Sequence, residues 1–357
     1  MKPIIYIKGS DINDVRLQKF IHYFVKRGEY VSFWGWSRDG QKASVEGVNS
    51  CYLLTGGGYG KKSRLFFFYI LWAIVVFFKC LITNLKGKII IAIDFDSALP
   101  VYWASKFKKI EYLYEVYDDF ALRYNFPSSV KKFVHKKDTK IMKNSKCVIH
   151  VDANRVSFKE CKWIIIENTP NDYWRGEVRP YDNMKHKFAI IGYFSDARGM
   201  EQIYRFAQAN TSIQFLLVGR FTSDNMKKEF ISLPNVEFHD LMPQMELFDL
   251  MKDCCGIFSL YNPGLEINRY AASNKVYDAM MMGIPVITNR EVINSAYIQE
   301  NGFGIVVDYE YGDSWSSLSN PSFVKVAKEL GIKGRDLYLK EYRFDALVEN
   351  RLVPVLK

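Results

Sequence analysis

The sequence has 357 residues, a length that favours two domains over a single hydrophobic core. Hydrophobic residues make up 48% and charged residues 25%, a composition that excludes disordered, collagen-like and low-complexity chains. Residues 1–170 carry 28 basic against 15 acidic side chains, whereas residues 171–357 carry 21 against 24. The basic first half therefore predicts an anionic partner: nucleic acid, an anionic membrane surface or a phosphorylated substrate.

The cysteines and the N-terminus bear on metal content and on location. The six cysteines and five histidines form no C-x-x-C and no H-x-x-x-H motif, so we expect no metal site. Cysteines outside such motifs favour reduced thiols and hence the cytoplasm. The apolar run at residues 4–7 is too short for a signal peptide and instead predicts a first buried strand.

Strand and helix patterns alternate from this first strand onward. Apolar residues recur at spacings of three and four between residues 17 and 24, which predicts one apolar face of a helix. Residues 30–34 then form the next predicted strand. A strand–helix–strand opening favours an α/β fold with a parallel, doubly wound sheet.

Two segments of the first half suggest a membrane. Residues 65–78 carry no charge, are rich in phenylalanine and have basic residues on both sides. A membrane span needs about 20 apolar residues, so this segment is a core helix, a helix that dips into a membrane, or a span. Residues 131–146 hold seven lysines and one acid, which is typical of a solvated helix face or of a face toward an anionic membrane.

Two pairs of carboxylates follow predicted strands of this half. Asp94 and Asp96 close the strand at 88–93, where they are able to hold a divalent metal or to cap the next helix. Asp118 and Asp119 follow the strand at 111–116. Because ligands of open α/β sheets bind beyond the carboxyl ends of strands, this second pair is placed to act on a substrate hydroxyl, with a helix cap as the alternative.

The second half repeats the alternation and adds basic residues. A glycine-bracketed loop at 192–199 contains Arg198, and a strand ending at Val218 leads to Gly219 and Arg220. The pattern of residues 273–288 predicts a helix N-cap, a short helix with Lys275 in its first turn, a helix end and then a strand. Because a helix N-terminus attracts anions, these residues predict a phosphate site.

These features resemble the GT-B glycosyltransferases of the group 1, family 4-like type, which synthesise bacterial surface polysaccharides among other glycans. The most specific part is the segment 274–287, which reads Asn-Lys-Val-Tyr-Asp-Ala-Met before Gly283 and Pro285. The resemblance implies two Rossmann-like doubly wound domains that face each other across a cleft. Supporting matches lie at 94–96, 117–119, 166–170, 192–199, 217–219 and 235–238.

The resemblance also implies roles for single residues. Arg198 and Lys275 would hold the donor diphosphate, and Asp278 the ribose. Asp118 or Asp119 would be the catalytic residue that faces the acceptor. Basic side chains and helix ends neutralise the leaving diphosphate in such enzymes, so we expect no metal and no cofactor beside a UDP- or GDP-linked sugar. Further donor-side residues are Gly192, Gly219, Arg220, Asn274 and Glu266, and acceptor-side residues are Gly9, Ser10, Asp94 and Asp96.

Two departures from the family pattern concern the donor sugar. The family often has a first glutamate eight residues before its second, but Tyr270 occupies that place, and Glu266 is the nearest upstream acid. An arginine often follows the glycine of the first loop of the second half, and here Tyr193 does. The contacts to the sugar and the stereochemical outcome, retaining or inverting, therefore stay open.

We predict an acceptor domain at 1–170, a linker at 171–187, a donor domain at 188–335 and a C-terminal helix at 336–357 that packs back toward the first domain. The expected partners are a nucleotide sugar, a polyprenyl-diphosphate-linked glycan acceptor and the anionic inner surface of the cell membrane. Nucleic acid is excluded because no recognition module accompanies the basic residues. The alternatives are a sugar-nucleotide epimerase on the same fold and a non-catalytic nucleotide-sugar-binding or membrane scaffold of an assembly complex.

Overall fold

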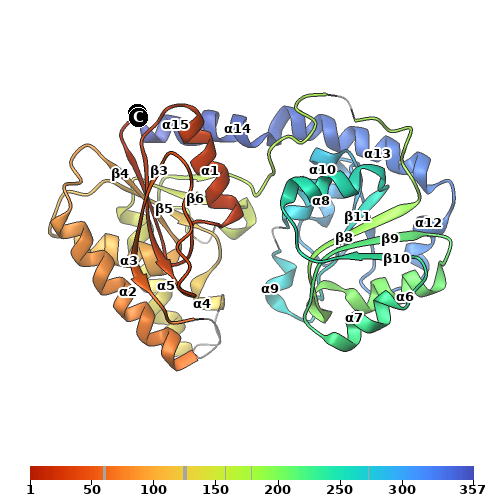
Figure 1. Cartoon of the computed structure of the whole chain (residues 1–357), viewed down its shortest axis with the longest axis horizontal. Helices are drawn as coiled ribbons and strands as arrows, with labels where there is room; N and C mark the ends of the chain where they lie inside the picture. The colour runs from red at the N-terminus through yellow and green to blue at the C-terminus, as the bar shows by residue number, and fades with distance from the viewer. Residues whose placement is uncertain (59–61, 124–126, 157, 178, 272) are drawn as a thin grey trace. The chain divides into compact units, whose positions relative to one another are not determined.

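The computed structural model describes residues 1–357 except 59–61, 124–126, 157, 178 and 272 (Figure 1). Contacts within the chain divide it into two compact units. Unit 1 comprises Met1–Glu167 and Leu347–Lys357, and unit 2 comprises Asn168–Ala346. Each unit is a parallel sheet with helices on both faces, so the prediction of an α/β, doubly wound fold is confirmed.

The sheet of unit 1 has seven parallel strands in the order β3-β2-β1-β4-β5-β6-β7. The central strands are buried along their whole length, as continuous apolar runs such as Ile89–Ile93 require. The strands are β1 (Ile4–Lys8), β2 (Val31–Ser37), β3 (Val48–Thr55), β4 (Ile89–Ile93), β5 (Tyr112–Val116), β6 (Cys147–His150) and β7 (Trp163–Ile165). The helices are α1 (Val15–Lys26), α2 (Lys62–Ile82), α3 (Asp94–Ala104), α4 (Phe120–Arg123), α5 (Ser128–Asn144), η1 (Ala153–Arg155), η6 (Val348–Leu352) and α15 (Val353–Leu356).

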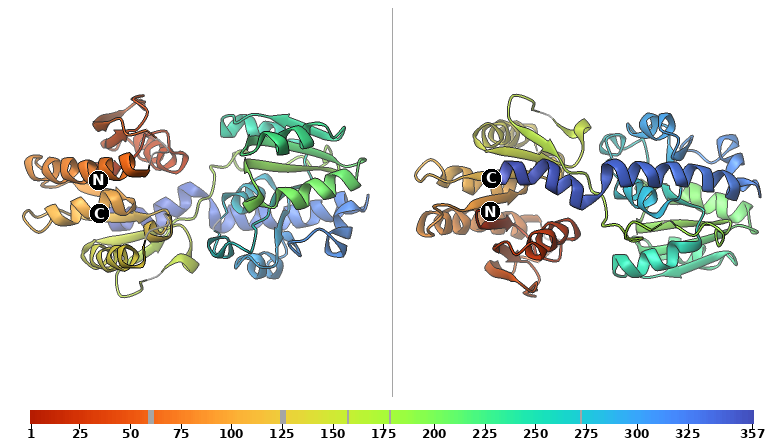
Figure 2. Two further views of the ribbon diagram at one scale, coloured as in Figure 1. Left: turned by 90° about the horizontal axis from the view of Figure 1, so that it is seen from below. Right: turned by 90° about the horizontal axis from the view of Figure 1, so that it is seen from above.

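One face of this sheet is covered by α2, α3 and α5, which lie side by side (Figures 1 and 2). Their buried residues join one core with the strands, and each helix contributes to it through residues such as Trp72, Val101 and Ile141. On the other face, α1 buries Phe20, Phe24 and their neighbours. Glu349, near the C-terminus, pairs with Tyr23 and Arg27 of α1, so the last residues are fastened to unit 1.

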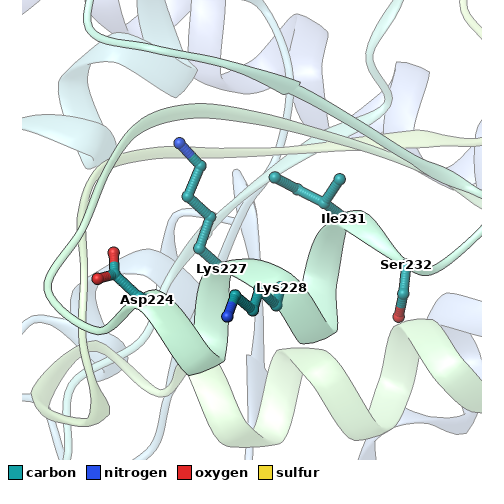
Figure 3. Close-up of a pocket in the computed structure, with 5 residues that line it drawn as sticks. All are labelled: Asp224, Lys227, Lys228, Ile231 and Ser232. Carbon is teal, nitrogen blue, oxygen red and sulfur yellow. The ribbon is translucent and has the colours of Figure 1, made fainter.

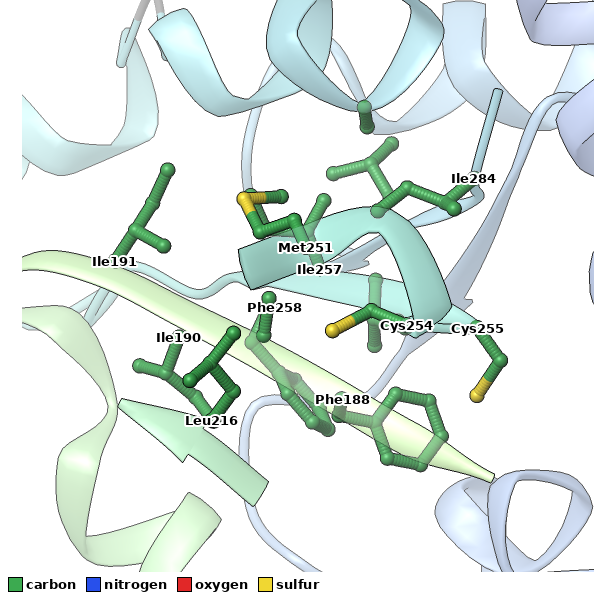
Figure 4. Close-up of a cluster of buried hydrophobic side chains, with 14 of the residues drawn as sticks. Phe188, Ile190, Ile191, Leu216, Met251, Cys254, Cys255, Ile257, Phe258 and Ile284 are labelled. Atoms are coloured by element: carbon green, nitrogen blue, oxygen red, sulfur yellow. The ribbon is translucent and has the colours of Figure 1, made fainter. Parts of the chain in front are cut away.

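The sheet of unit 2 has six parallel strands in the order β10-β9-β8-β11-β12-β13, packed against a core of aliphatic, sulfur-containing and aromatic side chains (Figure 4). Its strands are β8 (Lys187–Phe194), β9 (Gln214–Phe221), β10 (Val236–His239), β11 (Gly256–Ser259), β12 (Val286–Asn289) and β13 (Gly304–Val307). Its α-helices are α6 (Met200–Ala209), α7 (Asp224–Ile231), α8 (Gln244–Leu250), α9 (Glu266–Arg269), α10 (Asn274–Met282), α11 (Ser295–Glu300), α12 (Ser316–Ser319) and α13 (Phe323–Leu337), and α14 (Phe344–Leu347) ends at the boundary with unit 1. Short helices of other types are η2 (Asp196–Arg198), η3 (Met251–Asp253), η4 (Asp313–Trp315) and η5 (Tyr338–Tyr342).

Residues 171–187, predicted as a linker, are held tightly within unit 2. Arg179 is 1% exposed and donates four hydrogen bonds to main-chain carbonyls. Arg335 of α13 makes a bidentate pair with Asp172, at 2.6 and 3.0 Å. These bonds place the segment in the same compact unit as the second sheet.

The strand order reverses once in each sheet, between β1 and β4 in unit 1 and between β8 and β11 in unit 2. Loops that leave the carboxyl ends of the strands on either side of such a point diverge and open a crevice, where ligands of doubly wound sheets bind. The predicted site residues lie mainly on these loops.

Candidate functional site

In unit 2, the loop that follows β8 carries Arg198 at the end of η2. Gly199 comes next with φ 68°, and a Cβ atom there would lie 2.7 Å from Leu260 Cβ, so the position requires glycine. The loop after β11 is tied to this one, because Asn262 N donates to Ala197 O at 3.0 Å. The two loops beside the switch point therefore form one connected structure that holds Arg198 in place.

Tyr261 lies at the centre of these loops and was not among the predicted residues. Its buried ring supports the Arg198 guanidinium at 4.4 Å from the centroid. Burial raises the pKa of its hydroxyl, but the positive charges of Lys275 and Arg198, together with hydrogen bonds, lower the pKa below its ordinary value. Hydrogen bonds with Ser273 and Ser259 act in the same direction. Arg198 and Lys275 thus create a strongly positive potential around this hydroxyl.

The N-terminus of α10 lies on the same side of the sheet. Ser273 occupies the N-cap position, as predicted, but its hydroxyl is 2.8 Å from the Ser259 hydroxyl and does not cap the helix. The N–H groups of the first turn therefore lack a cap from this side chain and favour an anion. Asn274 is exposed and Lys275 half-buried in that turn, and Asp278 is buried one turn later.

The other donor-side residues are placed differently from the prediction. Gly192 lies within β8, and Gly219 and Arg220 lie within β9, so the two expected glycine loops begin later in the chain. The strands continue because the two glycines pair directly: a Cβ on Gly219 would lie 1.8 Å from Gly192 O. Arg220 is exposed at the end of β9. Glu266, also exposed, begins α9, and Tyr270 is 49% exposed at the end of that helix.

In unit 1, Gly9 and Asp96 meet at the switch point between β1 and β4. A Cβ on Gly9 would lie 2.1 Å from Asp96 Oδ2, so the carboxylate approaches the backbone only because this position is glycine. Asp94 has φ 60° at the abrupt turn from β4 into α3. Its buried Oδ1 accepts a hydrogen bond from Tyr117 N at 3.0 Å, which holds this unfavourable backbone in place.

Asp118 and Asp119 are both exposed in the connection from β5 to α4. The Asp119 carboxylate accepts the Ala121 N–H at 2.8 Å and so caps α4, which was the alternative considered for this pair. Asp118 follows directly after Tyr117, whose N–H is bonded to Asp94. Asp94 and Asp96, in the first turn of α3, therefore lie next to the connection that carries Asp118 and Asp119. In the described part of the chain, no group of three or more His, Cys, Asp or Glu residues is arranged to hold a metal ion.

Two basic residues at the carboxyl ends of β1 and β2, beside the same switch point, were not predicted. Lys8, the last residue of β1, pairs with Asp14 at 2.8 Å and lies 4.1 Å above the Tyr117 ring. Arg38, just after β2, donates to Gly9 O at 3.0 and 2.7 Å and stacks on Trp36. Neither has a motif around it. The feature that could have predicted them is their position, at the carboxyl ends of buried strands next to the switch point.

Comparison with known proteins supports the fold. No family model matches the sequence, and no curated protein matches it. Among solved structures, sucrose-phosphate synthase from Thermosynechococcus elongatus is similar over 100% of this chain and 99% of its own, with TM-score 0.70 and 16% identity. WaaG, a glycosyltransferase involved in lipopolysaccharide biosynthesis, matches over 99% of both chains, with TM-score 0.63 and 11% identity.

Anabaena HepE, solved in complex with UDP and glucose, also matches over 99% of both chains, with TM-score 0.68 and 13% identity. The two parallel sheets of seven and six strands, each with a switch point, are the same architecture. The chain therefore has the GT-B fold of two Rossmann-like domains, which is the fold that its sequence resembled.

Proposed function

We propose that this protein is a glycosyltransferase that moves a sugar from a nucleotide-sugar donor to an acceptor hydroxyl. The observation that carries the proposal is that Arg198 stacks on the Tyr261 ring, 4.4 Å from its centroid, while Lys275 and Arg198 both lower the pKa of the Tyr261 hydroxyl at the switch point of unit 2. Two cations beside a helix N-terminus that the Ser273 side chain does not cap suit a diphosphate, which carries its charge on closely spaced oxygens. The GT-B fold and the UDP-bound structure of HepE support this assignment.

Loss of the nucleoside diphosphate is the step that these groups would assist. As the bond between the sugar and the diphosphate breaks, negative charge develops on the leaving oxygen. Arg198, Lys275 and the first turn of α10 stabilise that charge without a bound metal. Asp278 is proposed to contact the ribose. Because it is buried on the helix face shared with Lys275, it is held rigidly relative to the diphosphate site.

The acceptor is proposed to bind at the switch point of unit 1, at Gly9 and Ser10 in the loop after β1 and at Asp94 and Asp96 in the first turn of α3. Asp118 or Asp119 is the proposed catalytic base for an inverting reaction, because both carboxylates are exposed just beyond the carboxyl end of β5. In a retaining reaction the leaving diphosphate itself takes the acceptor proton.

We further propose that the acceptor is a polyprenyl-diphosphate-linked glycan of surface polysaccharide synthesis, used at the inner face of the cell membrane. The excess of basic side chains in residues 1–170 supports an anionic, lipid-linked acceptor. The structural similarity to WaaG, a glycosyltransferase involved in lipopolysaccharide biosynthesis, supports the same class of product.

Slow hydrolysis of the donor tests the reaction class. The purified protein is incubated with UDP-, GDP- and CMP-sugars, and release of free sugar and nucleotide is measured by chromatography. We expect one donor to be hydrolysed, because GT-B enzymes activate the anomeric bond even toward water. A protein that binds a nucleotide sugar but never consumes it would instead be a scaffold. Conversion of a donor to its epimer would identify an epimerase.

Tyr261 provides a test of the diphosphate site by binding alone. We expect Tyr261→Leu to weaken UDP binding by about fivefold to tenfold, because loss of a cation–π support releases the Arg198 side chain. Tyr261→Phe keeps the ring and should keep most of the affinity. Both dissociation constants are measured by titration calorimetry, with thermal unfolding to confirm that the variants are folded. Equal losses in the two variants would contradict the role given to the ring.

A further inference from the structure

The most unusual surface of the protein is the outer face of α2. The segment Arg64–Ile82 is strongly apolar, with a mean hydropathy of 2.5, and yet only 17% of it is buried in the protein. By length and composition this helix is able to cross a membrane. Its exposed side chains include Phe66, Phe67, Ile70, Ile74, Phe78 and Ile82, each 47–78% exposed. Soluble proteins rarely expose so many large apolar side chains together, so this face calls for a partner.

The inner face of α2 belongs to the core of unit 1, which argues against a membrane span. Trp72, Val76 and Cys80 are 0% exposed and pack with the strands. The C-terminal end is fastened as well, because Lys108 Nζ donates to the carbonyls of Leu81, at 3.1 Å, and Thr83. Because one side of this helix packs against the sheet, lipid is unable to surround the helix. It therefore lies on the domain surface with one side exposed.

The exposed stripe continues into a groove between α2 and the end of α3. The groove has a volume of about 390 Å³, and its exposed lining is entirely apolar. Ile74 and Phe78 form one wall, and Trp103 and Phe107 form the other. Phe107 is 76% exposed. An apolar groove of this volume that opens onto an apolar surface suits a hydrocarbon chain.

Basic side chains surround this apolar surface. Lys106 lines the groove, and its Nζ is held by Asn144 Oδ1 of α5 at 2.8 Å, so α3 and α5 are joined there. On α5, Lys132, Lys136 and Lys140 are exposed and spaced by four residues, which puts them on one side of that helix. The described residues of α2 include no acid. Charge complementarity therefore selects an anionic partner for the layer of α2, α3 and α5.

We propose that this layer is a membrane-contact surface, on which the outer face of α2 enters an anionic phospholipid surface and one phospholipid acyl chain occupies the groove. The lysines of α5 and Lys106 lie at the level of the lipid phosphates, as in other interfacial helices. The membrane surface is a partner of the proposed glycosyltransferase. Its purpose rests on that proposed function, but the contact with lipid does not require catalysis. Such a surface would hold unit 1 where a lipid-linked acceptor is found.

Vesicle binding tests the surface without any catalytic step. The full chain is mixed with phosphatidylcholine vesicles, with or without phosphatidylglycerol, and the bound fraction is measured by flotation at low and at physiological ionic strength. We expect binding to anionic vesicles that weakens with salt. The double variant Phe78→Glu, Phe107→Glu should reduce it about tenfold or more, because two charges would have to enter the apolar layer. The triple variant Lys132→Gln, Lys136→Gln, Lys140→Gln should also reduce it about tenfold or more.

Unit 2 offers a matched control. Ile231 is 48% exposed on α7 and lies near Lys227 and Lys228 in a shallow pocket (Figure 3). Like Phe78, Ile231 is an exposed apolar residue with lysines nearby. Unlike Phe78, it does not belong to a long apolar helix. Ile231→Glu should bind vesicles as the unchanged protein does. An equal loss in this variant would indicate a general effect of added negative charge and would overturn the proposal.

The groove is tested by contact quenching. Phospholipids with brominated acyl chains quench tryptophan fluorescence on contact, and Trp103 lines the groove. We expect quenching on anionic vesicles and less quenching in Trp103→Phe. Identical quenching in the two proteins, or full vesicle binding by the Phe78 and Phe107 double variant, would overturn the assignment. Donor hydrolysis without vesicles is measured in parallel, so a failure of the glycosyltransferase proposal is seen separately from a failure of this surface.

Discussion

Replacing Lys275 or Arg198 with alanine is expected to lower kcat/KM for sugar transfer by about 10²–10³-fold, the loss typical when one preorganised stabiliser of developing charge is removed. Both residues are proposed to bind the same diphosphate, and the positive charges of both lower the pKa of the Tyr261 hydroxyl. The double variant should therefore lose less than the product of the two single effects. Steady-state kinetics with the donor identified by hydrolysis measures all three variants.

The control for this prediction is Arg205→Ala. Arg205 is an exposed residue of α6 that pairs with Glu201 one turn earlier, away from the switch point. Removing it takes one positive charge from the same unit, and such exposed pairs contribute little to stability. Transfer should stay close to that of the unchanged protein. Normal turnover by both Lys275→Ala and Arg198→Ala would show that the donor diphosphate binds elsewhere.

Replacing Arg179 with methionine is expected to destabilise unit 2 by about 3–5 kcal/mol. The buried guanidinium donates to the carbonyls of Met282, Gly283, Lys252 and Cys254 at 2.8–3.0 Å. Methionine fills similar space but leaves these four acceptors without the donor. Since Met282 and Gly283 end α10, the loss should also loosen the helix that carries Lys275. Urea unfolding followed by circular dichroism measures the change.

Arg175→Met is the matched control on the same segment. Arg175 lies on the same segment as Arg179, but its side chain is exposed and not buried. Its backbone has φ 52°, an unfavourable value for arginine and methionine alike, so the substitution adds no new strain. Its unfolding free energy should stay within about 0.5 kcal/mol of the original, as for most surface substitutions. A similar midpoint for the two variants would mean that Arg179 does not anchor residues 171–187.

The sequence patterns were sufficient to predict the alternation of strands and helices. Apolar spacing marked α1 at residues 17–24 because a helix with one buried face must repeat every three to four residues. Continuous apolar runs marked the central strands, which are buried on both faces. The edge strands β3 and β13 were not predicted. β3 is largely half-buried and mixes polar with apolar residues, so it carries no clear period. β13 is apolar but has only four residues, Gly304–Val307, which is too short for a period to show.

The site was predicted where local sequence determines local geometry. The segment 274–287 contains its own N-cap position, helix, Gly283 stop and strand, so Lys275 was assigned to a helix N-terminus from neighbouring residues alone. The ends of β8 and β9 were predicted wrongly. Glycine and arginine are typical of loops, but Gly192 and Gly219 pair across the sheet and allow both strands to continue. That pairing joins residues far apart in the chain.

By itself, then, the sequence determined the α/β class, the two-part organisation and the helix that begins at Asn274 with Lys275 in its first turn. These features follow from interactions between residues within a few positions of one another in the chain. Such interactions are already present when a helix or a strand forms locally. Only the tertiary structure decided that Tyr261 supports Arg198 beside Lys275, that Asp119 caps α4 and that α2 has a core face and an apolar exposed face. Each of these depends on which strands are neighbours and on which side of a helix meets the sheet. Long-range packing sets those relations, and no short stretch of residues encodes them.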